Sequence, residues 1–166
     1  MIRPARPSDG PRLRCLEAAV ARVAFPDPDD PSSTVRVERD LAAWVASEGL
    51  AEFSDWFDGL IDDPGHLWRV AESSGVIVGF IHGHCLGGVA RIQGLYIDQN
   101  WWGCGLSDRL MIEFDCWAND TAASLVVLAH NRRAIRFYTK HGFIIDPPEH
   151  CVIPGVIFMS RLPRPW

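Results

Sequence analysis

The chain has 166 residues, 48% of them hydrophobic, which is enough for one domain with a sizeable core, expected to span 1–166. The net charge of −5 argues against general nucleic-acid binding, and no apolar run is long enough to cross a bilayer. Five scattered cysteines without a CxxC pair support neither a disulfide framework nor a metal site. Because the start does not read as a signal peptide, we expect a cytoplasmic protein.

The first part of the chain is predicted to hold a short strand and three helices. Ile2–Ala5 contains a proline, which a sheet tolerates at its edge. Ser8 and Asp9 can cap the helix that follows, because short polar side chains accept from the first N–H groups of a helix. Two more helices are expected over Val35–Glu48 and Glu52–Ile61.

The middle of the chain changes to strands. Leu67–Glu72 and Val76–His84 are separated by Ser-Ser-Gly, which indicates a hairpin. Two glycines then lead into a third strand, Val89–Ile97. This region therefore predicts a meander of antiparallel strands.

The second half alternates strands with helices. A glycine-bearing loop leads into a helix over Leu106–Ala118, and the fully apolar run Leu125–Ala129 is typical of a buried parallel strand. Asn131 is expected to cap a helix that Gly142 ends. Two final strands are predicted, at 143–145 and 156–160. The whole order predicts an α+β fold, with a mixed sheet flanked by helices.

The loop Trp101–Ser107 lies between a predicted strand and a predicted helix and has glycines at 103 and 105. Consecutive backbone N–H groups at a helix N-terminus form an anion site without a charged side chain. An ordinary turn is the commoner explanation for two glycines alone. A nucleotide-binding loop is disfavoured, because the third glycine of a G-x-G-x-x-G fingerprint would fall at Asp108.

The stretch Asn131–Phe143 has the pattern N-x-x-A-x-x-F-Y-x-K-x-G-F after a buried strand. This pattern resembles the signature of the GNAT superfamily of N-acetyltransferases. Leu95-Tyr96-Ile97, followed by the glycine loop, resembles the acetyl-CoA motif of that family. The opening Ile2–Ala5 and the strand that begins at Val76 also fit, so the resemblance spans nearly the whole chain and is weakest in 25–64.

The resemblance implies the GNAT acyl-CoA N-acyltransferase fold, a mixed, mostly antiparallel sheet of six to seven strands whose central pair splays apart. Acetyl-CoA is the implied cosubstrate, lying in that gap and pairing with backbone groups of one splayed strand. Tyr138 is implied as the general acid that protonates the departing sulfur, and a core tyrosine is the alternative. The implied cofactor-binding residues, besides Tyr138, are Leu95, Tyr96, Ile97, Trp102, Gly103, Cys104, Gly105, Leu106, Ser107, Asn131 and Arg133.

The loop departs from the family pattern at three positions. The family commonly has arginine or glutamine at the place of Trp102, glycine or alanine at Ser107, and proline at Gln99. Loss of a basic side chain at 102 removes a phosphate contact and leaves the backbone cradle. Cys104 has either a lowered pKa near the helix N-terminus or simply a small side chain at a tolerant position.

The resemblance does not identify the general base. Some members of the family have a glutamate on the strand before Leu95, where this chain has Arg91, Gln93 and Gly94. His82 and His84 are two residues apart and face the same side of one predicted strand, so either could accept a proton near neutral pH. A hydrogen-bonded strand-end histidine is the alternative for both. Glu149 and His150 are further candidates.

The acceptor is expected to be a small-molecule or peptide amine, bound by the helical region Phe25–Asp63. Its excess of acids, with the aromatic residues Trp44, Phe53, Trp56 and Phe57, suits a cationic or aromatic-contacted amine. Aromatics in the core and acids in solvent are the alternative for each residue alone. For the whole chain the alternative function is a non-catalytic CoA-binding module. The resemblance also allows a homodimer and gives no reason to expect nucleic-acid or membrane partners.

Overall fold

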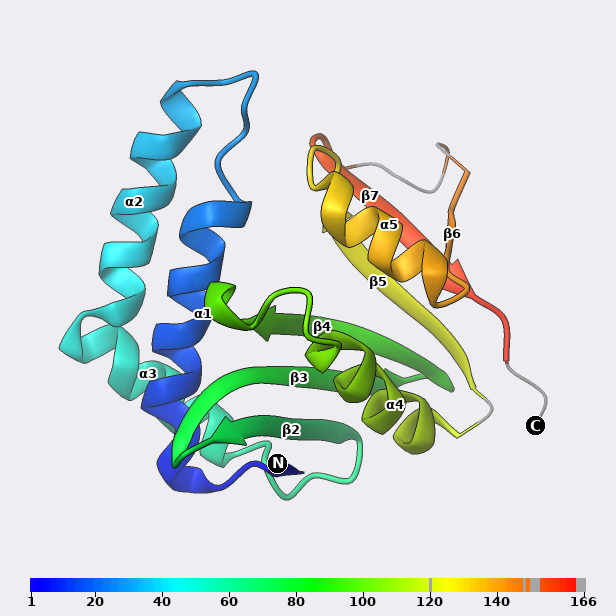
Figure 1. Ribbon diagram of the computed structural model, residues 1–166, viewed down its shortest axis with the longest axis horizontal. Coiled ribbons are helices and arrows are strands. Elements are labelled where there is room, and N and C mark those ends of the chain that lie inside the picture. The colour runs from blue at the N-terminus through cyan, green and yellow to red at the C-terminus, as the bar shows by residue number, and fades with distance from the viewer. Residues whose placement is uncertain (120, 148, 150–152, 164–166) are drawn as a thin grey trace.

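The computed structural model describes residues 1–119, 121–147, 149 and 153–163. Its described strands form one sheet in the order β1-β2-β3-β4-β5-β7-β6 (Figure 1). The β4–β5 pair is parallel and the other neighbouring pairs are antiparallel, which confirms the expected mixed sheet. The strands are β1 (Ile2–Pro4), β2 (His66–Ser73), β3 (Val76–Leu86), β4 (Val89–Ile97), β5 (Ala122–Leu128), β6 (Ile144–Ile145) and β7 (Val156–Arg161).

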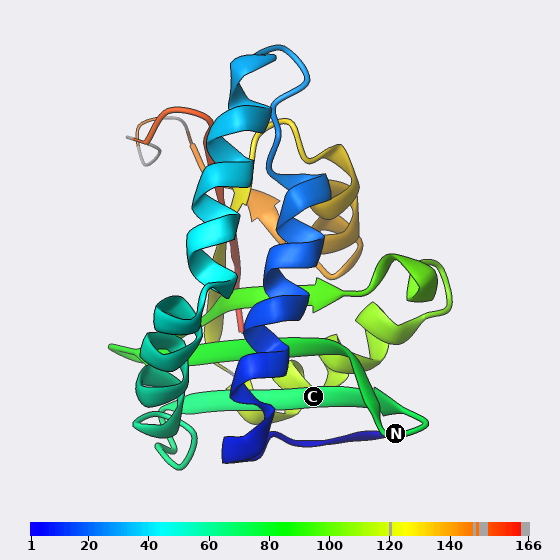
Figure 2. The same ribbon diagram turned by 90° about the vertical axis from the view of Figure 1, so that its left-hand side faces the viewer.

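Helices cover both faces of this sheet. The three N-terminal helices lie together on one face of β2, β3 and β4, and α4 packs on the other face of these strands. The last helix, α5, lies beside β5 and β7 and shares its core with α4 (Figures 1 and 2). The helices are α1 (Gly10–Ala24), α2 (Ser32–Val45), α3 (Ser47–Asp58), α4 (Leu106–Ala118) and α5 (Arg132–Lys140), with short 3₁₀ turns η1 (Pro7–Asp9) and η2 (Gln99–Trp101). The α+β prediction is therefore confirmed.

Two cores hold the helices on the sheet. On one face, Leu110 and Phe114 of α4 pack with Ile81 of β3, and all three side chains are fully buried. On the other, Leu13 of α1 and Phe57 of α3 are equally buried. Each such side chain contributes about 1.5–3 kcal/mol of burial free energy. The two cores therefore hold α4 and α1 against opposite faces of the sheet.

Local signals placed some helix ends correctly and others wrongly. The Asn131 prediction is confirmed, because its Oδ1 accepts from the backbone N–H of Ala134 at 3.1 Å. The Asp9 prediction is wrong, because its carboxylate makes no cap of α1 and instead accepts from the backbone N–H of Arg6 and from Arg3. The guanidinium of Arg3 is a stronger donor than a helix amide, and it holds the carboxylate away from the first turn of α1.

The predicted boundaries of α2 and α3 are a few residues too late in the chain. The observed α2 ends at Val45 because Ala46 is extended, with φ −63° and ψ 158°, and α3 begins directly after it. Apolar spacing alone does not reveal a break of one residue between two helices. Among the described residues, no helix combines the length and hydropathy needed to span a bilayer.

The parallel pair at the sheet centre stays together for only part of its length. Pairing between β4 and β5 runs from Val89–Ala122 to Ile92–Leu125, and then both strands continue without a shared ladder. At the same point β4 has a bulge, since His82 pairs with Gly94 while Gly83 pairs with Ile92. Gln93 is the extra residue. A bulge bends its strand and increases its twist, and here it coincides with the divergence of β4 from β5.

Candidate functional site

A cavity of about 480 Å³ opens beside the diverging ends of β4 and β5, and we call it the thioester cleft. It is bounded by β4, the β4–α4 loop, the first turns of α4 and α5, and the C-terminal half of α1. Its lining residues are Val20, Val23, Ala24, Leu95, Ile97, Trp102, Gly103, Gly105, Ser107, Asp108, Asn131, Arg133, Ala134, Phe137 and Tyr138. Many of the predicted cofactor-binding residues are therefore brought together here.

The β4–α4 loop turns sharply into the cleft. Gly103 and Gly105 have φ of +80° and +78°, which is the left-handed region that favours glycine. Gly105 is the N-cap of α4, whose first N–H groups have no intrahelical partner. The N–H of Trp102 already donates to the carbonyl of Gln99 at 3.1 Å, so the free part of the anion cradle begins after Trp102. Backbone donors and a helix dipole at this loop suit an anionic ligand.

Tyr138 and Asn131 lie seven residues apart on α5, so both face the thioester cleft. The Tyr138 side chain is 8% exposed and packs edge-on against Phe137 and Phe143. Burial raises the pKa of Tyr138 well above its ordinary value. The phenol is therefore protonated at neutral pH. Asn131 uses its side-chain oxygen as the helix cap, which leaves its amide nitrogen for a ligand.

Trp102 and Arg133 meet across this cleft. The guanidinium carbon of Arg133 lies 3.7 Å from the centroid of the Trp102 ring. The indole N–H of Trp102 donates to the carbonyl of Ile97 at 2.9 Å, which anchors the ring on the end of β4. Burial lowers the pKa of Arg133 somewhat, yet an arginine remains charged. The loop thus has a basic group at hand although residue 102 is not basic.

Asp108 also lines the cleft, where an unpaired acid would repel an anion. Its Oδ1 is 2.8 Å from Lys140 Nζ and 2.9 Å from His141 Nε2. The hydrogen bond from Lys140 outweighs burial and lowers the pKa of Asp108, with His141 adding to the effect. The negative charge of Asp108 is therefore balanced by Lys140 of α5, and its carboxylate is also held by the C-cap residue His141.

Three other predicted cofactor-binding side chains do not line the thioester cleft. Cys104 Sγ turns back to the carbonyl of Trp101 at 2.9 Å, and Leu106 is buried in the core. The Tyr96 side chain faces the opposite side of β4, as expected from strand alternation beside Leu95. These residues can contribute backbone groups to the cleft.

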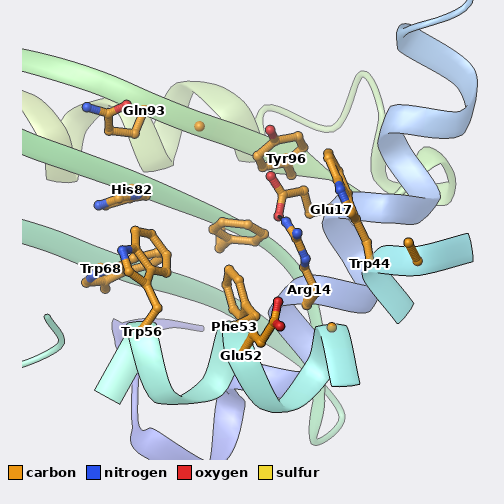
Figure 3. Close-up of a pocket in the computed structure, with 14 residues that line it drawn as sticks. Arg14, Glu17, Trp44, Glu52, Phe53, Trp56, Trp68, His82, Gln93 and Tyr96 are labelled. Carbon is orange, nitrogen blue, oxygen red and sulfur yellow. Dashed lines mark hydrogen bonds and ion pairs between the residues drawn. The ribbon is translucent and has the colours of Figure 1, made fainter. Parts of the chain in front are cut away.

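A second cavity, of about 440 Å³, lies on that opposite side of β4, between the sheet and α1–α3 (Figure 3). We call it the aromatic cavity. Burial, followed by the neighbouring Glu17 carboxylate, raises the pKa of Tyr96 here. The lining residues are Arg14, Glu17, Ala43, Trp44, Gly49, Glu52, Phe53, Trp56, Trp68, Phe80, His82, Gln93, Gly94 and Tyr96.

Of the two predicted base candidates, His82 lines the aromatic cavity. Its ring stacks on Trp68 with 3.7 Å between centroids, and its Nε2 is 3.0 Å from Nδ1 of His66. Burial, and then the two neighbouring histidines, lower the pKa of His82 to about 3. His84 stacks on the far side of His66, at 4.2 Å, and lines neither cavity.

Glu149 is likewise exposed and away from both cavities, and His150 lies outside the described residues. Within the part of the chain that the structure describes, no group of three or more His, Cys, Asp or Glu side chains could hold a metal ion. The assignments of catalytic and binding roles to individual residues stay predictions.

Sequence patterns did not single out Arg14, Glu17 or His66 as site residues. Arg14 and Glu17 have the i,i+3 spacing of a helix ion pair, and such pairs are common on solvated faces. His66 is one of six histidines and has no motif around it. Their importance comes from tertiary contacts with Trp44, Tyr96 and His82, which lie far away in the chain.

Comparisons agree with this architecture. Residues 34–143 match the model of the Acetyltransferase (GNAT) family. The chain is similar in structure to the PaiA N-acetyltransferase of Thermoplasma acidophilum in complex with coenzyme A, with 17% identity, 98% of each chain covered and a TM-score of 0.77.

Two further similar structures are the ribosomal-protein-alanine N-acetyltransferase of Brucella melitensis and a GNAT acetyltransferase of Streptococcus pneumoniae. The first has 19% identity, covers 98% of this chain and 99% of its own, and has a TM-score of 0.71. The second has 19% identity, 99% of each chain covered and a TM-score of 0.70. No curated protein matches the chain. The likenesses confirm the predicted fold.

Proposed function

Because the chain belongs to the acetyltransferase (GNAT) family, we propose that it transfers an acetyl group from acetyl-CoA to a primary amine. The observation that carries this proposal is one cleft that gathers a protonated tyrosine, an anion-binding turn and an arginine: Tyr138, the Gly103–Gly105 turn and Arg133. A pyrophosphate fits the turn and the arginine, and a thiol leaving group fits the phenol.

In the proposed reaction the neutral amine nitrogen attacks the thioester carbonyl carbon, so that a C–N bond forms and the C–S bond breaks. Tyr138 gives its phenolic proton to the departing sulfur. The nitrogen loses one proton, and solvent returns one to the phenolate, so no net charge is left on the protein. Asn131 orients the donor through its amide nitrogen, and Asp108 is kept neutralised by Lys140.

The proton from the amine has one candidate acceptor among the predicted residues. His82 borders the aromatic cavity and is uncharged at neutral pH, so it can accept a proton. With a pKa of about 3 it is a weak base by itself, and its bond to His66 offers the proton a way to a second imidazole. We propose this pair as the exit for the proton. A cytoplasmic location and a homodimer stay predictions.

The test is thiol release from acetyl-CoA across a panel of amines, with Tyr138→Phe as the variant. A general acid contributes about 10²–10⁴-fold, so we expect kcat to fall by at least about tenfold while the KM for acetyl-CoA is nearly unchanged. Thr139→Ala removes an exposed hydroxyl from the next residue of α5 and is the matched control. Equal kcat in Tyr138→Phe and the parent protein removes Tyr138 from the mechanism.

Thiol release by no amine in the panel, together with a thermal shift on adding CoA, would replace the catalytic proposal by the non-catalytic CoA-binding alternative. Absence of both signals would contradict the use of the thioester cleft for CoA.

A further inference from the structure

The one arginine of the aromatic cavity has its charge paired with an acid. Its Nη1 is 2.8 Å from Oε2 of Glu17, and both side chains are largely buried. The guanidinium also lies against two rings, 4.1 Å from the Trp44 centroid and 5.1 Å from that of Phe53. Its Nε is buried and has no hydrogen-bond partner among the described residues. Arg14 therefore offers little to an incoming carboxylate, since its charge is balanced and its faces are covered.

The charge that remains unbalanced in this cavity is negative. Glu52 lines the cavity from α3, is exposed, and makes no hydrogen bond or ion pair with any described residue (Figure 3). His82 is uncharged because burial and its histidine neighbours hold its pKa at about 3. With Arg14 and Glu17 cancelling, one acid without a partner borders the space where the acceptor would lie.

The walls between Glu52 and His82 are flat and aromatic. Trp68 stacks on His82, and Trp56 stands edge-on to both, with centroids 5.7 Å and 5.8 Å away. Trp56 is 47% exposed, although it belongs to an otherwise packed group of rings. Aromatic faces bind other rings and cations, and a half-exposed tryptophan on a cavity wall leaves its surface available to a ligand.

We propose that the aromatic cavity selects a small primary amine carried on an aromatic ring and bearing no carboxylate beside the amine. This inference rests on the proposed function. The ring lies against Trp56 and Trp68, and Glu52 attracts the approaching ammonium, which loses one proton to solvent before its nitrogen attacks. A carboxylate on the acceptor meets the like charge of Glu52, while the charge of Arg14 is already balanced by Glu17. A volume of about 440 Å³ is in the range of small-molecule sites.

The test compares acceptors that differ in one group each, by thiol release from acetyl-CoA. The acceptors are 2-phenylethylamine, phenylalanine, phenylalaninamide and propylamine. We expect kcat/KM for 2-phenylethylamine to exceed those for phenylalanine and propylamine by at least about tenfold, equal to 1.4 kcal/mol. Phenylalaninamide, whose carboxylate is masked, should regain much of the loss. Equal or better use of phenylalanine, or of propylamine, overturns the inference.

Variants test the role of Glu52. An exposed ion pair is worth about 0.2–1 kcal/mol, so Glu52→Gln should lower kcat/KM for 2-phenylethylamine by about two- to fivefold. It should also narrow the discrimination against phenylalanine and leave the KM for acetyl-CoA unchanged. Asp55→Asn removes an acid from the same helix outside the cavity, and we expect no change. Equal effects of the two variants would overturn the role of Glu52.

A binding assay separates this inference from the proposed function. If no amine releases thiol, the transfer reaction fails, and binding then decides on the cavity. Quenching of tryptophan fluorescence by 2-phenylethylamine, with none by phenylalanine at the same concentration, supports the selectivity. No quenching by 2-phenylethylamine, or equal quenching by both, overturns it.

Discussion

Arg133 lies over the ring of Trp102, with 3.7 Å from its guanidinium carbon to the ring centroid. The two residues come from different walls of the thioester cleft, the β4–α4 loop and the first turn of α5. The stack therefore couples the position of the anion-binding turn to the helix that carries Tyr138. It also brings a fixed positive charge to a loop whose residue 102 is not basic.

We expect Arg133→Gln to raise the KM for acetyl-CoA by at least about two- to fivefold, the value of a cation–π contact of about 0.5–1 kcal/mol, with a smaller change in kcat. Steady-state kinetics with varied acetyl-CoA measures this. Arg132→Gln removes the neighbouring charge outside the cleft and serves as the control. A KM that rises equally in both variants would mean that only net charge matters.

Gly94→Ala should impair binding of the amine acceptor and leave binding of acetyl-CoA unchanged. A Cβ on Gly94 would lie 2.5 Å from Cε2 of Tyr96, so the ring must move out of the wall of the aromatic cavity. We expect a loss of about 1–3 kcal/mol in the free energy of unfolding and a higher KM for the amine. Urea unfolding and kinetics measure the two effects.

Gly59→Ala is the control for this change. Its Cβ would lie 3.5 Å from the carbonyl oxygen of Trp56 and 3.6 Å from that of Asp55, which are ordinary contact distances, and the φ of Gly59 is −69°. An unchanged amine KM in Gly94→Ala would contradict the placement of Tyr96 in the acceptor wall.

His82 should make the protein less stable as the pH falls from about 6.5 toward 3. Its pKa is about 3 in the folded chain and near the ordinary 6.5 when unfolded, so the unfolded chain binds more protons in this window. The free energy of unfolding should fall by up to about 1.4 kcal/mol per pH unit. His82→Phe keeps a ring on Trp68 and should flatten this slope in urea titrations at successive pH values. An unchanged slope would show that His82 is not the titrating group.

Asp9 should affect the free energy of unfolding at a lower pH than His82 does. Burial alone would raise the pKa of Asp9, but hydrogen bonds from Arg3 and from the backbone of Arg6 outweigh it and lower the pKa. Its stabilising effect is complete above about pH 4 and is lost as the pH falls through the folded pKa. Asp9→Asn should cost about 1–3 kcal/mol at pH 7 and little at pH 2. Exposed Asp62→Asn is the control, and an equal loss at both pH values would contradict the pairing.

Features set by neighbouring residues could be predicted from the sequence. The Asn131 cap, the turn at Gly105 and the strand alternation that separates Leu95 from Tyr96 are all local. The resemblance then indicated which of these local features share a cleft, and the structure brings Asn131 and Tyr138 to it.

Features that depend on partners far away in the chain could not be predicted. The Trp102–Arg133 stack and the lowered pKa of His82 arise only once separate elements pack together. Asp9 is a different case, because its partner is close in the chain: Arg3, six residues before it, binds the carboxylate that was predicted to cap α1.

The bulge at Gln93 has a consequence for how such a sheet could gain or lose a binding site. Without Gln93, β4 would keep its register with β3 and could pair with β5 along its whole length. Backbone hydrogen bonds between the two strands would then close the gap. The same deletion would turn Tyr96 toward the other layer. A single inserted amino acid is thus linked both to the opening of the sheet and to the side of β4 on which Tyr96 lies.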